Sequence, residues 1–314
     1  MFRLFLTSAD KDPIVKTAPE KIAYDGRALS FFSKHPESMS MISSPVKQRL
    51  GLALSGGATR GLAHIGVLQA FEDNGLRPDY LSGTSIGAFA AALYAFGVPL
   101  KEIRDMGQGM TPVNVSKLKL SRFALFSNEE LARLIQSKIG KARIEEALIP
   151  LAIMAVDIGT GEKFVLRRGE VAPAVMASNA VPGIYRPIVI EGRLLVDGGI
   201  AEDVPISPLR PMGADIVVAV NLSADRKYRP PEDIVDILLN AFDIAIDEDT
   251  RVQVKAADVL IEPRLSDFRR MDVSQIDALI AEGYRATAAS IEKIRIALAR
   301  PADSDAASGA PPCR

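Results

Sequence analysis

Short, uninterrupted apolar runs alternate with longer amphipathic stretches along most of this chain. Such runs are typical of strands buried on both faces, and they lie at residues 49–55, 80–82, 149–156, 214–221 and 258–261. Helical periodicity predicts helices between and after them, at residues 60–74, 86–96, 128–139, 232–249 and 273–298. Gly75 and Gly97 stand where the first two helices should end.

Two hairpins interrupt this alternation in the middle of the chain. The first turns at residues 159–161 and adds a strand at residues 163–167. The second spans residues 187–196, with Glu191 and Gly192 at its turn. Strands that alternate with helices predict an α/β fold of three layers, in which an open, mostly parallel sheet lies between helices on both faces.

The two ends of the chain lack this pattern. Residues 1–48 show little periodicity and are rich in Ser, Pro and Lys, so we expect a partly disordered N-terminal extension there. Residues 301–314 form a low-complexity tail, for which we also expect disorder. No internal repeat is evident, and residues 49–300 are predicted to form one catalytic domain.

Composition and charge exclude several classes of function. A net charge of −1 over 314 residues offers no basic excess for a nucleic acid. The single cysteine, Cys313, and the two histidines argue against disulfides and against a metal site, and no cofactor is expected. No apolar run is long enough for a transmembrane helix, and the first residues do not resemble a signal peptide. We expect a cytoplasmic protein, with a peripheral membrane contact as a further expectation.

The stretch Gly83-Thr-Ser85-Ile-Gly87 follows a predicted strand and precedes an alanine-rich helix. It fits the G-x-S-x-G pattern, in which a serine stands at a sharp strand-to-helix bend and the glycines allow close approach of neighbouring backbone. The start of the helix then favours negative charge beside the serine. Ser85 is therefore a candidate nucleophile, and a tight turn without chemistry is the alternative.

A second glycine-rich loop, Gly56-Gly57-Ala58-Thr-Arg60-Gly61, also lies between a strand and a helix. Consecutive glycines can turn backbone N–H groups toward an anion, and ester cleavage needs such groups to hold the oxyanion of the tetrahedral intermediate. We assign the oxyanion hole to Gly56, Gly57 and Ala58, with the N–H groups of the last two as donors. Nucleotide binding is the alternative, although the loop lacks the lysine and the hydroxyl of a P-loop.

A serine nucleophile needs a base, and the chain offers few. His64 lies early in a predicted helix, His35 lies in the extension, and the late histidine of a Ser-His-Asp triad is missing. Asp197 is the best-placed carboxylate, because an apolar strand ends there and two glycines follow, which should expose the side chain at the sheet edge. Since the ordinary pKa of aspartate is about 3.9, this base requires burial and contact with the serine. Asp157, at the end of another strand, is the rival.

Three motifs in this order resemble the patatin-like phospholipases, above all their bacterial branch of esterases and lysophospholipases. They are Gly56-Gly57-Ala-Thr-Arg-Gly61, Gly83-Thr-Ser85-Ile-Gly87 and Asp197-Gly-Gly199. The stretches Asp157-Ile-Gly-Thr-Gly161 and Ala177-Ser-Asn-Ala-Val-Pro-Gly183 also resemble this family. The resemblance spans about residues 50–222.

The resemblance implies a patatin-like α/β/α fold and a dyad of Ser85 and Asp197 that needs no histidine. It implies hydrolysis of lipid acyl esters through an acyl-enzyme, with phospholipids, lysophospholipids or short esters as substrates. The sequence contains no calcium loop of the EF-hand kind, so we expect calcium-independent catalysis. Ala58 departs from the family's third loop glycine but keeps the N–H donor. The segment 113–126 mixes apolar residues with three cations, and it is either a cap that meets anionic lipids or a solvated connection.

Two other classes of protein stay open. One is a catalytically silent regulatory protein with the same fold, which the intact serine, aspartate and glycine loop disfavour. The other is a nucleotide-binding α/β protein, which predicts tight binding of a phosphate ligand and no reaction with serine-directed probes. Among enzymes, an acyltransferase or a thioesterase with the same dyad is the alternative, and only assays with an acyl acceptor separate it from a hydrolase.

Overall fold

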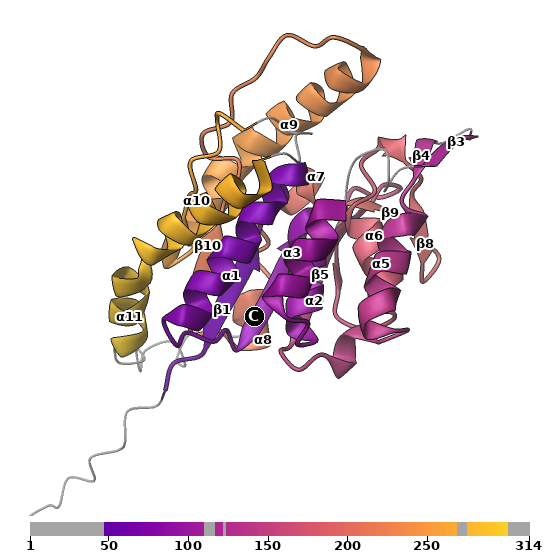
Figure 1. Ribbon diagram of the computed structural model, residues 1–314. Coiled ribbons are helices and arrows are strands. Elements are labelled where there is room, and N and C mark those ends of the chain that lie inside the picture. The colour runs from indigo at the N-terminus through magenta and orange to yellow at the C-terminus, as the bar shows by residue number, and fades with distance from the viewer. Residues whose placement is uncertain (1–46, 110–116, 122–123, 269–274, 301–314) are drawn as a thin grey trace, which may run out of the picture. The chain divides into compact units, whose positions relative to one another are not determined.

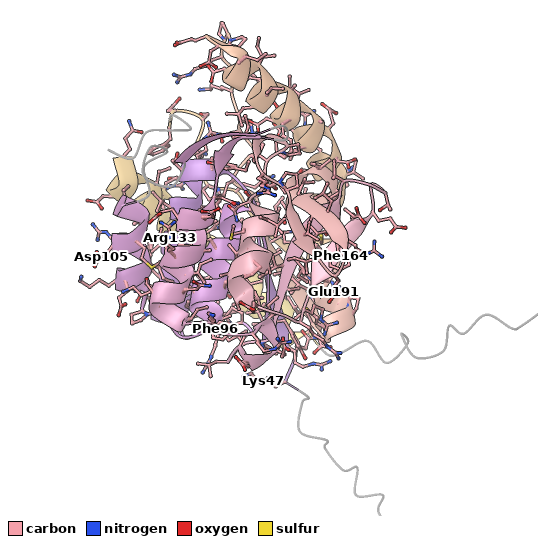
Figure 2. All side chains as sticks on the ribbon, turned by 90° about the vertical axis from the view of Figure 1, so that its right-hand side faces the viewer. Lys47, Phe96, Asp105, Arg133, Phe164 and Glu191 are labelled. Atoms are coloured by element: carbon pink, nitrogen blue, oxygen red, sulfur yellow. The ribbon has the colours of Figure 1, made fainter. Side chains whose placement is uncertain are left out.

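The computed structural model describes residues 47–109, 117–121, 124–268 and 275–300, and a sheet of eight strands organises them. The strands of this main sheet are β1 (Leu50–Leu54), β2 (Tyr80–Thr84), β5 (Leu151–Asp157), β6 (Lys163–Leu166), β8 (Ile188–Ile190), β9 (Arg193–Asp197), β10 (Ile216–Val220) and β11 (Val259–Ile261). A smaller sheet consists of β3 (Lys117–Ser121), β4 (Ala124–Ser127) and β7 (Gly183–Tyr185). The predicted extension and tail lie outside the described residues except for Lys47 and Gln48, so they stay predictions (Figure 2 labels Lys47).

Helices connect most of these strands (Figure 1). They are α1 (Ala63–Asp73), α2 (Ile86–Ala95), α3 (Leu100–Gly109), α5 (Glu129–Ile139), α6 (Val171–Ser178), α7 (Gly199–Glu202), α8 (Leu209–Met212), α9 (Ile234–Gln253), α10 (Ile276–Ala288) and α11 (Ile291–Ala299). Three 3₁₀ turns, η1 (Ala58–Leu62), η2 (Ile144–Glu146) and η3 (Val254–Ala256), complete the helical structure of the described residues. Within the same ranges, no helix combines the length and the apolar character that a membrane span requires.

β1 lies inside the main sheet, between β2 and β10, and all three strands run parallel. The strand order is β11-β10-β1-β2-β5-β9-β8, with β6 also paired to β5. β6 and β9 both pair antiparallel with β5, so the sheet is parallel on one side and mixed on the other. Because β1 and β2 are parallel neighbours, the loops that follow them meet at one edge of the sheet, where ligands of open α/β sheets bind.

Both faces of the main sheet are buried, as the continuous apolar runs predict. Leu50, Leu52 and Leu54 of β1 belong to a large core that includes α1 and α2, whereas Ala53 belongs to a second, smaller core. Leu209 of α8, alternate residues of β10 and the loop residues Val204, Ile206 and Ala214 complete that second core. The predicted α/β fold with a mostly parallel sheet is confirmed.

The predicted strands and hairpins, and most predicted helices, are present within a few residues of their expected bounds. The second hairpin turns at Glu191 and Gly192, whose φ angles are 52° and 75° (Figure 2 labels Glu191). Two consecutive residues with positive φ are what a two-residue turn between twisted strands requires. The turn that the sequence predicts there is therefore confirmed.

The single helix predicted at residues 273–298 is wrong, because two helices occupy this stretch. α10 ends at Ala288, and α11 begins after Ser290. The Ser290 hydroxyl donates to the Ala286 carbonyl at 3.2 Å, and a side chain that bonds back in this way competes with helical hydrogen bonding. The apolar periodicity continues across the break, which is why the sequence pattern does not reveal it.

α1 and α10, which are far apart in sequence, pack side by side at two glycines (Figure 1). A Cβ at Gly66 would stand 1.9 Å from the Ile280 carbonyl oxygen. A Cβ at Gly283 would stand 2.0 Å from the Ala63 carbonyl oxygen. The two helix backbones therefore touch, and no side chain fits between them at these points.

Gly66→Ala and Gly283→Ala should each destabilise the protein by about 2 kcal/mol, because α1 and α10 would have to separate. In an uncrowded helix the same change stabilises by about 1 kcal/mol, so the sign of the effect is diagnostic. Urea unfolding followed by circular dichroism measures it, with Ala281→Ser on the exposed face of α10 as the control. Wild-type stability in both glycine variants would contradict the backbone contact.

Candidate active site

Ser85 stands between β2 and α2 in a backbone conformation that few residues adopt. Its φ of 53° and ψ of −125° are strained for a residue with a side chain, at a cost of roughly 1–3 kcal/mol. Neighbouring backbone enforces the bend: a Cβ at Gly83 would stand 2.5 Å from the Gly87 carbonyl oxygen, and one at Gly87 would stand 2.2 Å from that of Leu54. The predicted reason for both glycines is confirmed, and the bend has the geometry of a nucleophile elbow.

Two residues at the end of α6 hold the Ser85 backbone. The Ser85 N–H donates to Ser178 Oγ at 2.8 Å, and the Ser178 hydroxyl donates to the Met154 carbonyl at 2.6 Å. The Asn179 amide donates to the Ser85 carbonyl at 2.8 Å, and the Ser85 hydroxyl donates to Asn179 Oδ1 at 3.4 Å. The sequence pointed to this segment only through the family resemblance, since a Ser-Asn pair carries no signal of such contacts by itself.

The glycine-rich loop after β1 lies beside the elbow, since a Cβ at Gly56 would stand 3.4 Å from Ser85 Cβ. Gly57 has a φ of 152° and Ala58 a φ of 52°, and their N–H groups open η1, where the first N–H groups have no partner inside the turn. Gly56 differs, because its N–H already donates to the Asp203 carbonyl at 3.3 Å and to Asp203 Oδ1 at 3.1 Å. Of the three residues predicted for the oxyanion hole, Gly57 and Ala58 stay candidate donors, whereas the N–H of Gly56 is engaged.

The register of the sheet places Asp197, the last residue of β9, at the same height along the strands as Ser85. Thr84 pairs with Met154 on β5, and the next residue of β5, Ala155, pairs with Asp197. The two candidate catalytic residues therefore stand two strand spacings apart, roughly 10 Å along the sheet. Both line the same pocket. Asp197 is 2% exposed, so the expectation of an exposed side chain at the sheet edge is wrong: the carboxylate lies in a pocket and accepts a hydrogen bond from the Gly199 N–H.

Burial raises the pKa of Asp197 to about 7. The hydrogen bond from the Gly199 N–H, at 2.9 Å, and the neighbouring Ser85 hydroxyl act against that rise, and the charge of Asp203 adds to it. Burial also raises the pKa of Asp203 to about 6, against the attraction of Arg226. Buried carboxylates with raised pKa values beside a strained serine are characteristic of active sites.

The other candidate bases lie away from this cluster. His64 is fully buried, its Nε2 stands 2.8 Å from the Ser55 carbonyl oxygen, and burial lowers its pKa to about 4. Asp157 accepts a hydrogen bond from Arg193 at 3.1 Å and does not line the pocket beside Ser85. His35 lies outside the described residues. Both described rivals are therefore explained as structural residues.

A pocket opens beside the elbow, between the glycine loop and α9. Its lining includes the polar residues Ser85, Asn179, Asp197 and Asp203 and the apolar residues Leu62, Ile86, Leu131, Val181, Leu239, Phe242 and Ile246. Leu239, Phe242 and Ile246 follow each other at helical spacing, so one face of α9 covers the pocket. Among the residues that the structure places, no group of three His, Cys, Asp or Glu side chains is arranged to hold a metal ion. The pocket can receive an apolar chain beside a polar reaction centre.

A sequence profile of the patatin-like phospholipases matches residues 52–210, about half of the chain. The chain belongs to the patatin-like phospholipase family. This family consists of carboxylic ester hydrolases, and the matched segment contains the glycine loop, Ser85 and Asp197. The resemblance inferred from the three sequence motifs is therefore confirmed at the level of the family.

Relatives of this patatin-like chain include bacterial and fungal proteins. It is 34% identical over 184 residues to an uncharacterized NTE family protein of Mycobacterium tuberculosis, a match that covers 58% of this chain and 50% of that protein. It is 26% identical over 281 residues to lysophospholipase NTE1 of Pyricularia oryzae, a match that covers 78% of this chain and 18% of that protein. The chain thus spans about half the length of the mycobacterial relative and less of the fungal one.

One solved structure with a similar fold is that of VipD from Legionella pneumophila. The two chains superpose with a TM-score of 0.52 at 14% sequence identity, and the match covers 80% of this chain and 67% of VipD. At this identity the comparison concerns the fold alone. It supports the mostly parallel sheet with flanking helices as the architecture of this patatin-like protein.

Ala58 replaces a glycine of the patatin-like pattern at a position where φ is 52°, which costs an alanine roughly 1 kcal/mol. Ala58→Gly should therefore leave the stability unchanged or raise it by up to about 1 kcal/mol, because relief of strain offsets the larger unfolded-state entropy of glycine. Thermal unfolding measures the change. Ala281→Gly, in the exposed interior of α10, is the matched control and should lose about 1 kcal/mol. An equal loss at both positions would show that Ala58 is not strained.

Proposed function

We propose that this chain is a serine lipid acyl hydrolase that acts through a dyad of Ser85 and Asp197. The observation that carries the proposal is a strained serine at a helix N-terminus that lines the same pocket as a buried carboxylate. Such a conformation costs stability, and strain of this kind concentrates at functional sites. Membership of the patatin-like phospholipases and the name of the fungal relative, a lysophospholipase, support esters of lipids as the substrate class.

In the first half-reaction, Ser85 Oγ attacks the ester carbonyl carbon and Asp197 accepts the hydroxyl proton. The carbonyl oxygen becomes an oxyanion, which the N–H groups of Gly57 and Ala58 and the N-terminus of α2 stabilise. The tetrahedral intermediate collapses, the proton passes from Asp197 to the leaving alcohol, and Ser85 retains the acyl group. Water then attacks the acyl-enzyme, and Asp197 takes its proton and returns it to Ser85 Oγ as the carboxylic acid leaves.

Asp197 can act as this base because it is buried. An aspartate in water, with a pKa of about 3.9, holds a serine proton poorly. Burial raises the pKa of Asp197 to about 7, so its ionised form binds a proton more readily at neutral pH. The contacts of Ser178 and Asn179 with the Ser85 backbone keep the nucleophile in place, and the mechanism needs no histidine.

The apolar side chains of α9 and α2 in the pocket support a fatty acyl chain as the part of the substrate bound there. We therefore propose three classes of substrate: phospholipids, lysophospholipids and simple carboxylic esters. Lipid substrates lie in membranes. We therefore also propose that the protein is cytoplasmic and contacts a membrane surface peripherally. The predicted cap at residues 113–126 lies partly outside the described residues, and only the backbone of β3 and β4 is placed within it.

Hydrolysis of para-nitrophenyl butyrate tests the dyad. Ser85→Ala and Asp197→Asn should each lower kcat/KM by about 10³-fold or more, because nucleophile and base act as one unit. A fluorophosphonate probe should label the wild type on Ser85, as read by mass spectrometry. Asp157→Asn, which changes another buried acid at the end of a strand, is the matched control and should keep activity within about threefold.

Each remaining alternative has its own signature in this experiment. Activity retained in Asp197→Asn would rule out the dyad. An unlabelled and inactive wild type would support the silent or the nucleotide-binding protein, which titration calorimetry with nucleotides separates. Acyl transfer that outpaces hydrolysis once an alcohol or a thiol is added would support an acyltransferase.

The pH dependence of hydrolysis reports the base. Asp197 must be ionised to accept the serine proton, so kcat/KM should rise with pH through a midpoint of about 7, the pKa that burial gives this carboxyl. An aspartate with an ordinary pKa would place the midpoint at about 4. The rate of the butyrate ester, corrected for its spontaneous hydrolysis, measures the profile. A flat profile from about pH 5 to pH 8 would be incompatible with a base of raised pKa.

A further inference from the structure

The pocket contains a second acid, Asp203, that the dyad mechanism does not use. It follows α7 and is 4% exposed. Its main-chain carbonyl and its Oδ1 both accept the Gly56 N–H, whereas its Oδ2 is buried and has no hydrogen-bond partner within the described residues. A buried carboxylate oxygen without a donor destabilises a fold, so its presence in this pocket needs a functional explanation.

Asp203 stands next to both halves of the site. The position that a Cβ of Gly56 would take is 2.5 Å from Asp203 Oδ1 and 3.4 Å from Ser85 Cβ. The position that a Cβ of Gly199 would take is 3.2 Å from Asp197 Oδ1 and 3.4 Å from Asp203 Oδ1. Glycines at these two points therefore allow the Asp203 carboxylate to approach the nucleophile and the base together.

Charged groups from three other elements surround Asp203. Arg226, in the segment after β10, stabilises its negative charge, and Asp247 on α9 opposes that charge. Arg226 is itself paired with Asp243 and Asp247, and the described residues contain no ion pair between Arg226 and Asp203. Arg60 of η1 lines the same pocket. Asp203 is thus held by the glycine loop and not by a salt bridge.

We propose, on the basis of the function proposed above, that Asp203 is a positioning residue that anchors the glycine loop at Gly56 and, through its charge, controls the protonation of Asp197. The anchor keeps the N–H groups of Gly57 and Ala58 directed at the oxyanion. The charge makes Asp197 hold a proton more tightly, because two neighbouring carboxylates disfavour ionisation of each other. Asp197 is therefore a stronger acceptor of the serine proton.

Two substitutions separate the anchor from the charge. Asp203→Asn keeps an oxygen for the Gly56 N–H but removes the charge, so the midpoint of the kcat/KM profile should move to lower pH by about half a unit or more. Asp203→Ala also removes the anchor, so its kcat should fall about tenfold below that of the Asn variant, with KM changed less than about threefold. Glu202→Gln is the matched control: this similarly buried acid of α7 bonds Ser207 and does not line the pocket, so the midpoint should stay in place.

The outcomes separate this inference from the function on which it rests. An inactive wild type, or hydrolysis that survives Ser85→Ala, would remove the proposed function itself. With a Ser85-dependent wild type, an unchanged midpoint in Asp203→Asn would overturn control by charge, and equal kcat values for the Asn and Ala variants would overturn the anchor. Melting temperatures show which variants fold. If Asp203→Ala does not fold, Asp203→Ser replaces it in the comparison of kcat. Serine keeps a polar oxygen but on a shorter side chain.

Discussion

The close approach of backbone segments around Ser85 is the constraint on which the rest of the site depends. Gly87 stands against the carbonyl groups at the end of β1, and Gly83 stands against the first turn of α2, so β1, β2 and α2 are locked together. This contact imposes the positive φ of Ser85 and brings the glycine loop of β1 beside it. Strain persists in a fold only where the surrounding packing over-determines it. The elbow and the candidate oxyanion loop are therefore one structural unit.

The acidic half of the site comes from the mixed side of the sheet. Asp197 ends β9, Asp203 follows the short α7, and burial raises their pKa values to about 7 and about 6. Burial thus raises the proton affinity of a carboxyl group to about that of an unperturbed histidine side chain. The same burial destabilises the fold. Because the folded-state pKa of Asp197 exceeds that of the unfolded chain, this destabilisation grows as the pH rises from about 4 to about 7.

Local patterns were sufficient to predict the order of strands and helices, the family, and Ser85 and Asp197 as candidates, because apolar runs and glycine spacings are local. The contacts of Asn179 and Asp203 could not be predicted, since they join segments that only the strand register brings together. The burial of Asp197 was missed for the same reason, since the pocket that encloses its carboxylate is built from segments distant in sequence. The break at Ser290 was missed because a hydroxyl that bonds back to its own helix leaves apolar periodicity intact.

The family match ends at residue 210, but the sheet continues beyond it. β10, at residues 216–220, pairs with every residue of β1, and α10 lies against α1 backbone to backbone. A fragment that stopped at residue 210 would turn the strand that carries the glycine loop into a sheet edge with unpaired N–H and C=O groups. The segment shared with the family therefore contains the candidate chemistry without being a complete folding unit. Its strand pairing is completed by the last third of the chain, so a truncation designed on the family boundaries is expected to aggregate.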